Sequence, residues 1–112
     1  MAVATSTKRA TAEAMLHKAA IRHRFALLVC GDEVLHGKPA PDIYLAAVAA
    51  LGEHPTDCAA FEDSSNGVRA AVAAGLVTVQ IPDIVAPPAD VVALGHRIAP
   101  DILTGARQIG CI

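Results

Sequence analysis

Short apolar runs alternate with segments of helical periodicity along the chain, and this alternation restricts the fold more than any other feature. Strands joined by helices of 10–12 residues imply right-handed crossovers and a parallel sheet with helices on both faces. We therefore expect a Rossmann-like, three-layer α/β fold. The predicted strands lie at the start of 1–7 and at 26–30, 58–61, 76–81 and about 97–99.

Apolar residues recur at helical spacing between these strands. The first predicted face consists of Ala12, Met15, Leu16, Ala19 and Ala20, with Ser6 or Thr7 as the N-cap. The second consists of Ile43, Ala46, Ala47, Ala50 and Leu51, ending at Gly52. The third consists of Val68, Ala71 and Val72, between a Ser64 cap and Gly75. A short helix and a terminal helix from Asp101 are expected within 90–110.

The composition of the chain excludes several classes of partner and setting. The 112 residues suit one domain, and no apolar run approaches the roughly 20 residues of a membrane span, so we expect no membrane partner. A formal charge of −2 argues against nucleic acid. The three cysteines form no C-x-x-C pair, which indicates a reducing, cytoplasmic setting.

Polar groups follow three of the predicted strands, where parallel sheets bind their ligands. They are the hydroxyls of 5–7, the loop 31–38 with Lys38, and the pair Glu62 and Asp63. The hydroxyls suit an anion site or an ordinary helix cap. Lys38 is either held towards the sheet edge by its neighbouring prolines or solvated. The two carboxylates suit Mg²⁺ or a helix start.

Taken together, these groups would form a phosphate site with a metal ion, because phosphoryl transfer needs cations at the phosphoryl oxygens. Three segments then match a family in order and spacing: VATST at 3–7, GKPAPD at 37–42, and FEDSSNGVRAAVAAG at 61–75. They resemble motifs II, III and IV of the haloacid dehalogenase-like (HAD) hydrolases. The likeness is strongest to their sugar-phosphate phosphatases and β-phosphoglucomutases.

The resemblance implies a role for each matching residue. Thr5 and the N–H of Ser6 would bind the transferring phosphoryl group, and Lys38 would act as the catalytic and phosphate-binding cation. Glu62 and Asp63 would hold Mg²⁺. The family reacts through an aspartyl-phosphate.

The family's motif I, D-x-D-x-[TV], is absent from this sequence, and so is the small cap domain. The nucleophile is therefore missing. So is the central strand, which in the family lies between the motif II and motif IV strands. We expect residues 1–112 to be the C-terminal part of a HAD-like core domain, with Met1 an internal methionine or a misplaced start. The sheet would be incomplete, and another chain could supply the missing strand.

The sequence therefore predicts a Mg²⁺-dependent phosphatase or phosphomutase for a small phosphorylated metabolite, inactive as this chain alone. The alternative is a non-catalytic remnant or interaction protein whose exposed strand edge pairs with another chain. A phosphoacceptor receiver domain fits less well, because a receiver's lysine follows its phosphoacceptor strand whereas Lys38 precedes Asp63.

Overall fold

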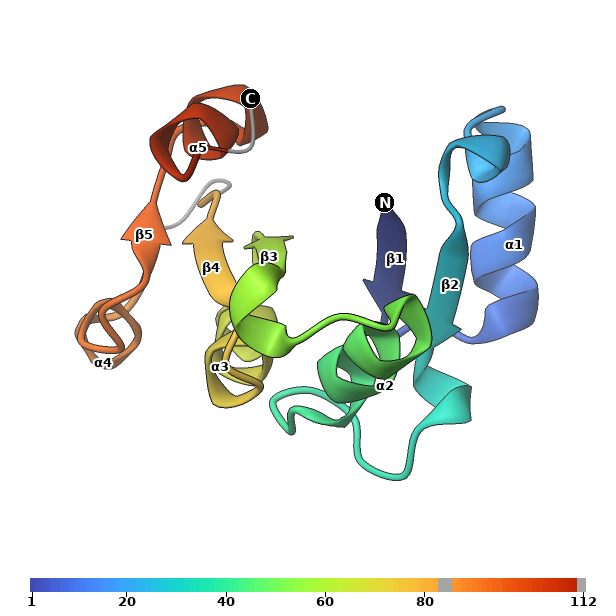
Figure 1. Cartoon of the computed structure of the whole chain (residues 1–112), viewed down its shortest axis with the longest axis horizontal. Coiled ribbons are helices and arrows are strands. Elements are labelled where there is room, and N and C mark those ends of the chain that lie inside the picture. The colour runs from blue at the N-terminus through green and yellow to red at the C-terminus, as the bar shows by residue number, and fades with distance from the viewer. Residues whose placement is uncertain (83–85, 111–112) are drawn as a thin grey trace.

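Strands and helices alternate through the computed structural model, which describes residues 1–82 and 86–110 (Figure 1). The strands are β1 (Ala2–Thr5), β2 (Leu27–Cys30), β3 (Ala59–Glu62), β4 (Val77–Gln80) and β5 (Arg97–Ile98). The helices are α1 (Arg9–Lys18), α2 (Asp42–Leu51), α3 (Ser65–Ala73), α4 (Ala89–Val92) and α5 (Ile102–Gln108). The predicted α/β class is confirmed.

The strands form two separate parallel sheets. One has the order β1-β2, with Ala2 opposite Leu27 and Thr5 opposite Cys30. The other has the order β3-β4-β5. In the described part of the chain no backbone hydrogen bond joins β1 to β3, although these two edge strands are neighbours in Figure 1. The prediction of an incomplete parallel sheet is therefore confirmed.

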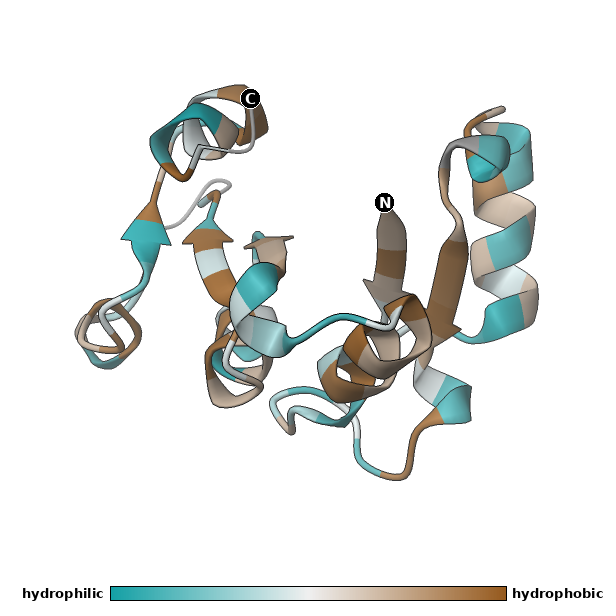
Figure 2. Ribbon diagram, in the orientation of Figure 1, coloured by the Kyte–Doolittle hydropathy of each residue, from teal (hydrophilic) through white to brown (hydrophobic). Residues whose placement is uncertain are grey.

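Helices cover opposite faces of the β1-β2 sheet, because successive side chains of a strand point to opposite sides. Leu28 and Cys30 of β2 pack with Ala12 of α1. The intervening Val29 packs in a second cluster with Ile43 of α2. Figure 2 shows hydrophobic colour along β2, while α1 carries much hydrophilic colour.

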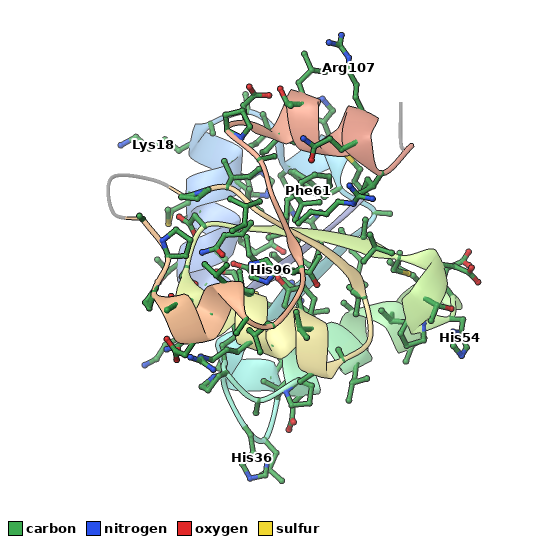
Figure 3. The ribbon with its side chains drawn as sticks, turned by 90° about the vertical axis from the view of Figure 1, so that its left-hand side faces the viewer. Lys18, His36, His54, Phe61, His96 and Arg107 are labelled. Atoms are coloured by element: carbon green, nitrogen blue, oxygen red, sulfur yellow. The ribbon has the colours of Figure 1, made fainter. Side chains whose placement is uncertain are left out.

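The β3-β4-β5 sheet is covered in the same way. Ala60 of β3 belongs to the cluster that contains Ala70 and Ala71 of α3. On the other face a Cβ at Gly105 of α5 would press against Val79, so the missing side chain lets α5 approach the sheet closely. In Figure 3 Phe61 lies beneath α5, whereas Lys18, His36, His54 and Arg107 project outward.

The start of α1 differs from the prediction. Its N-cap is Lys8 with no side-chain cap, rather than Ser6 or Thr7. Asp32 accepts a hydrogen bond from the Arg9 N–H at 3.0 Å instead, so a loop distant in sequence satisfies one of the free N–H groups of the first turn.

The predicted apolar face of α1 is only partly correct. Ala12 is buried, but Met15 is 62% exposed, and Ala19 and Ala20 lie beyond the helix. The reason is that α1 packs on a sheet of only two strands, which covers a narrow strip of the helix. On α2, Ile43 and Ala47 are buried as predicted; Leu51 and its neighbour Ala50 are exposed, and Tyr44 and Val48 are buried beside Ile43 and Ala47.

Other local predictions are confirmed. Gly52 ends α2 in the left-handed region, Ser64 caps α3, and a terminal helix follows Asp101. The Asp101 side chain also caps that helix, which was not predicted from the sequence. The third strand lies one residue later than predicted, at 59–62, so Glu62 is its last residue. Among the described residues, no helix is long and apolar enough to cross a bilayer.

Candidate functional site

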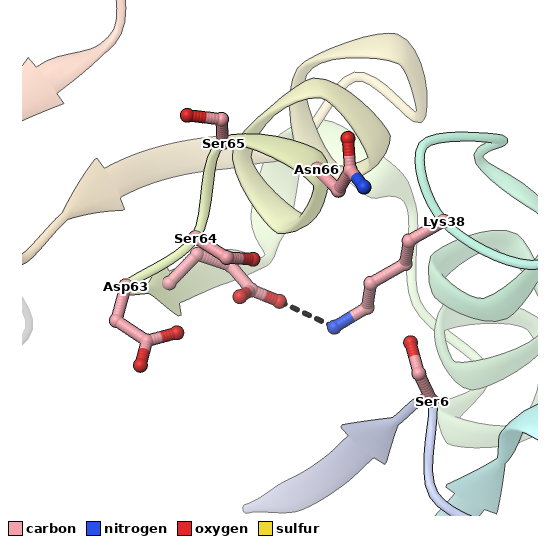
Figure 4. A pocket seen from close by; sticks show the side chains of 7 residues that line it. Ser6, Lys38, Asp63, Ser64, Ser65 and Asn66 are labelled. Carbon is pink, nitrogen blue, oxygen red and sulfur yellow. Dashed lines mark hydrogen bonds and ion pairs between the residues drawn. The ribbon is translucent and has the colours of Figure 1, made fainter.

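A depression of about 470 Å³ lies where the carboxyl ends of β1 and β3 converge (Figure 4). It is lined by Ser6, Lys38, Glu62, Asp63, Ser64, Ser65 and Asn66. Four of the five predicted site residues therefore meet at one place, although they come from three segments far apart in the sequence. Thr5, the fifth, does not line the depression.

Lys38 reaches the site from the loop before α2, and its side chain is only 11% exposed. Its Nζ donates a hydrogen bond to Glu62 Oε1 at 2.6 Å and a longer one to the carbonyl oxygen of Ala4 at 3.4 Å. Ala4 belongs to β1 and Glu62 to β3, so this ammonium group links the two half-sheets. The alternative of a solvated surface lysine is wrong.

The side chain of Glu62 is closely surrounded by other residues and is only 9% exposed. Besides Lys38, the hydroxyl of Tyr44 donates a hydrogen bond to Glu62 Oε1. A Cβ at Gly67 would overlap the carboxylate, so glycine at this position of α3 leaves room for the Glu62 side chain in the conformation that it adopts. Burial, and secondarily Glu62, raises the pKa of Tyr44, and the phenol therefore remains protonated and acts as the donor.

Asp63 follows Glu62 and is exposed. Its carboxylate forms no hydrogen bond or ion pair with the other described residues, and the residue lines the depression. Ser64 accepts a hydrogen bond from the Gly67 N–H at 3.0 Å as the cap of α3. The predicted helix start is thus present, but neither carboxylate of the acidic pair forms that cap.

Thr5 and Ser6 differ in their surroundings. The Thr7 N–H donates to Thr5 Oγ1 at 3.2 Å, so this hydroxyl closes a local turn. Ser6 lines the depression, and its carbonyl lies so close to Gly31 that a Cβ there would clash. The Gly31 N–H also donates to the Thr7 carbonyl at 3.1 Å. The loop after β2 therefore holds the Ser6 segment in place.

A second group of potential metal ligands comprises Cys30, Asp32 and Glu33, whose ligand atoms lie within 4.8 Å of one another. Both oxygens of Glu33 already accept hydrogen bonds from the Arg9 guanidinium, at 2.9 and 3.0 Å. Burial raises the pKa of the Cys30 thiol. A neighbouring cation and a protonated thiol make this group a poor metal site.

Tyr44 and Gly67 were not singled out as functional residues in the sequence. Tyr44 is the chain's only tyrosine, and it follows the GKPAPD segment within one helical turn. Gly67 is a glycine inside a predicted helix, which signals close approach of another group. Asn66 and Ser65 carried no such signal.

Comparison with known proteins identifies the family of the chain. A sequence model of the haloacid dehalogenase-like hydrolases matches residues 1–75, and the chain belongs to this family. Fructose-1-phosphate phosphatase YqaB of Escherichia coli is 44% identical over 81 residues, 72% of this chain and 43% of the relative. Protein CbbY of Rhodobacter capsulatus is 40% identical over 111 residues, 96% of this chain and 48% of the relative.

Solved structures agree. A putative β-phosphoglucomutase from Thermotoga maritima superposes with a TM-score of 0.84 at 30% identity, covering 96% of this chain and 51% of that one. CbbY from Rhodobacter sphaeroides, solved in complex with phosphate, has a TM-score of 0.76 at 35% identity. The match covers 88% of this chain and 44% of the CbbY chain. The chain thus spans about half the length of the relatives that it matches. The predicted resemblance to sugar-phosphate phosphatases is confirmed.

Proposed function

We propose that this chain is the phosphate- and metal-binding part of a Mg²⁺-dependent phosphoryl-transfer hydrolase. Its substrate would be a small phosphorylated metabolite such as a sugar phosphate. The observation that carries the proposal is the meeting of Ser6, Lys38, Glu62 and Asp63 around one depression. The phosphatases among its relatives support the same activity.

The oxygen donors at the depression suit Mg²⁺. This ion prefers one or two carboxylates together with water and phosphate oxygens. Asp63 offers an unpaired carboxylate, and the space left by Gly67 accommodates the Glu62 carboxylate beside it. Asp63 would therefore bind Mg²⁺ directly, and Glu62 would bind it directly or through water. When bound, the ion would neutralise charge on the phosphoryl oxygens.

The cationic group of the site is the Lys38 ammonium. It would neutralise the incoming phosphate, and the N–H of Ser6 would donate to a phosphate oxygen. The Thr5 hydroxyl would join them once its turn with Thr7 opens. The nucleophile remains unassigned, because no D-x-D motif is present. We therefore propose that the chain alone does not hydrolyse phosphate esters.

A complementary polypeptide is part of this proposal. The edges of β1 and β3 that face each other carry backbone groups without sheet partners in the described part of the chain. One parallel strand between them would complete the sheet and bring a carboxylate next to Lys38.

The free thiols of Cys30 and Cys58 fit the cytoplasmic setting that we also propose. The relatives give no support to a purely non-catalytic role.

Complementation tests the proposed function. The chain is mixed with the N-terminal segment of E. coli fructose-1-phosphate phosphatase that its match does not cover. Hydrolysis of p-nitrophenyl phosphate and fructose 1-phosphate is followed with and without Mg²⁺. We expect activity only when both polypeptides and Mg²⁺ are present.

Two lysine variants sharpen this test. Lys38→Met should abolish the recovered activity, because the phosphate loses its cation. Lys18→Met removes an equal charge from the outer end of α1 and should leave activity unchanged. A stable, folded mixture without activity would contradict the proposal.

A further inference from the structure

Tyr44 contacts both charged residues at the centre of the site. Its hydroxyl donates a hydrogen bond to Glu62 Oε1, the same oxygen that accepts from Lys38 Nζ. The Lys38 Nζ also lies 5.2 Å from the centre of the Tyr44 ring, within cation–π range. One side chain of α2 therefore touches the carboxylate of β3 and the ammonium of the preceding loop.

The place of Tyr44 makes these contacts rigid. The residue is 7% exposed and belongs to the apolar cluster with Ile43, Ala47 and Ala70. Packing locks the ring, and the ring carries its hydroxyl to Glu62. A phenylalanine would fill the same apolar space, so the packing of α2 does not require the hydroxyl.

Resting on the proposed function, we infer that Tyr44 is a positioning residue for the metal and phosphate site. Its hydroxyl fixes the rotation of the Glu62 carboxylate, and its ring backs the Lys38 ammonium. Both charged groups are then held in place before a ligand arrives. Partners of metal-ligating carboxylates commonly act in this way.

Metal affinity provides the first measurement. Mg²⁺ binding to the intact chain is measured by isothermal titration for the wild type and Tyr44→Phe. We expect Tyr44→Phe to weaken Mg²⁺ binding about tenfold, as is usual when a partner of a metal ligand is lost. The folded fraction of each variant is measured in the same buffer by circular dichroism.

Thr78→Val is the matched control. Thr78 is 5% exposed, and its hydroxyl donates to the Leu76 carbonyl at 3.1 Å, away from the depression. This variant also removes one buried hydroxyl, but we expect it to keep wild-type Mg²⁺ affinity. Tyr44→Phe with wild-type affinity, or Thr78→Val with an equal loss, would overturn the inference.

A second measurement separates this inference from the proposed function. The ¹³C shift of the Glu62 carboxyl is compared between wild type and Tyr44→Phe at one neutral pH without metal. We expect it to move in Tyr44→Phe and to stay unchanged in Thr78→Val. Wild type that binds no Mg²⁺ contradicts the proposed function, whereas an unmoved Glu62 shift overturns the role of Tyr44 regardless of metal binding.

Discussion

Lys38 and Glu62 form an ion pair that is nearly removed from water, with side chains 11% and 9% exposed. A buried pair is costly to desolvate, so its presence is weak support for stability by itself. It is better explained by function, because a ligand phosphate and a cation can take over the partners of each group. The pair preserves an anion site and a cation site next to each other until both ligands bind.

The pair predicts a non-additive effect on stability. Lys38→Met should lower the free energy of unfolding by about 3 kcal/mol, because it leaves a buried carboxylate without its cation. The double variant Lys38→Met/Glu62→Gln should recover most of that loss. Urea unfolding followed by circular dichroism measures these two variants and the single variant Glu62→Gln. A double variant with the sum of the two single losses would contradict this account.

At the scale of residues, the sequence predicts which groups meet but not what holds them. The sequence could place Lys38, Glu62 and Asp63 together because each was predicted to follow a strand of one parallel sheet, and the three do line one depression. The contact from Tyr44 could not be predicted, because it depends on how α2 turns its face towards β3. The local turn of Thr5 with Thr7 was not predicted either, because the hydroxyls of 5–7 suit an anion site or a helix cap as well.

At the scale of elements, α3 begins at the edge of the site, and its cap holds the turn between Asp63 and Gly67. Ser64→Ala removes the hydroxyl that accepts from the Gly67 N–H and should cost about 1 kcal/mol of unfolding free energy. Ser64→Asn retains an acceptor at the N-cap and should cost much less. Thermal unfolding of both variants checks this expectation, and equal losses would contradict the role assigned to the acceptor at the N-cap.

Arg9 links the α1 helix to the loop after β2, because its guanidinium donates two hydrogen bonds to the Glu33 carboxylate. The Arg9 hydrogen bond lowers the pKa of Glu33 below its usual range. A lowered carboxyl pKa contributes stability above the unfolded value of about 4.3, and this contribution is lost as the pH falls through the folded pKa.

Removing Arg9 should therefore reduce the acid sensitivity of α1. We expect the wild-type melting temperature to fall more than that of Arg9→Met between about pH 6.5 and about pH 3, because only the wild type loses the Arg9–Glu33 contribution. Scanning calorimetry at both pH values measures this difference. Equal falls in the two proteins would contradict the assigned role of Arg9.

The α1 helix also shows which features hydrophobic periodicity cannot predict. The pattern located α1 correctly, but the N-cap and the buried face were set by tertiary contacts. Asp32 satisfies the Arg9 N–H from 23 residues away, so no local cap was required. In contrast, Ser64 and Asp101 cap their helices within three residues. The Ser64 cap and a helix starting at Asp101 were both predicted.

At the scale of the molecule, the chain is two half-sheets connected through α2, α3 and the Lys38 link. The alternation of strands and helices was sufficient to predict the parallel α/β fold. The division into β1-β2 and β3-β4-β5 could be predicted only because a family motif was missing. Local sequence patterns predict the helices and strands that are present. An absent strand leaves no such pattern, because it changes only how the remaining strands pair.

Hydrogen exchange should reveal the incomplete sheet. We expect the amides of β4, which has strands on both sides, to exchange more slowly than those of β1, an edge strand. Adding the complementary segment should slow exchange in β1 and β3 and leave β5 unchanged. Uniform protection of β1 and β4 in the chain alone would contradict the two-sheet structure.

The central claim is that the converging ends of β1 and β3 hold a divalent cation beside a phosphate. Mn²⁺ substitutes for Mg²⁺ at oxygen sites and broadens the nuclear resonances of nearby residues, so titrating the labelled chain with Mn²⁺ locates the ion directly. We predict broadening centred on Asp63 and the first turn of α3, which excess Mg²⁺ reverses. Broadening centred on Asp32 and Glu33, or none that saturates, would contradict the claim.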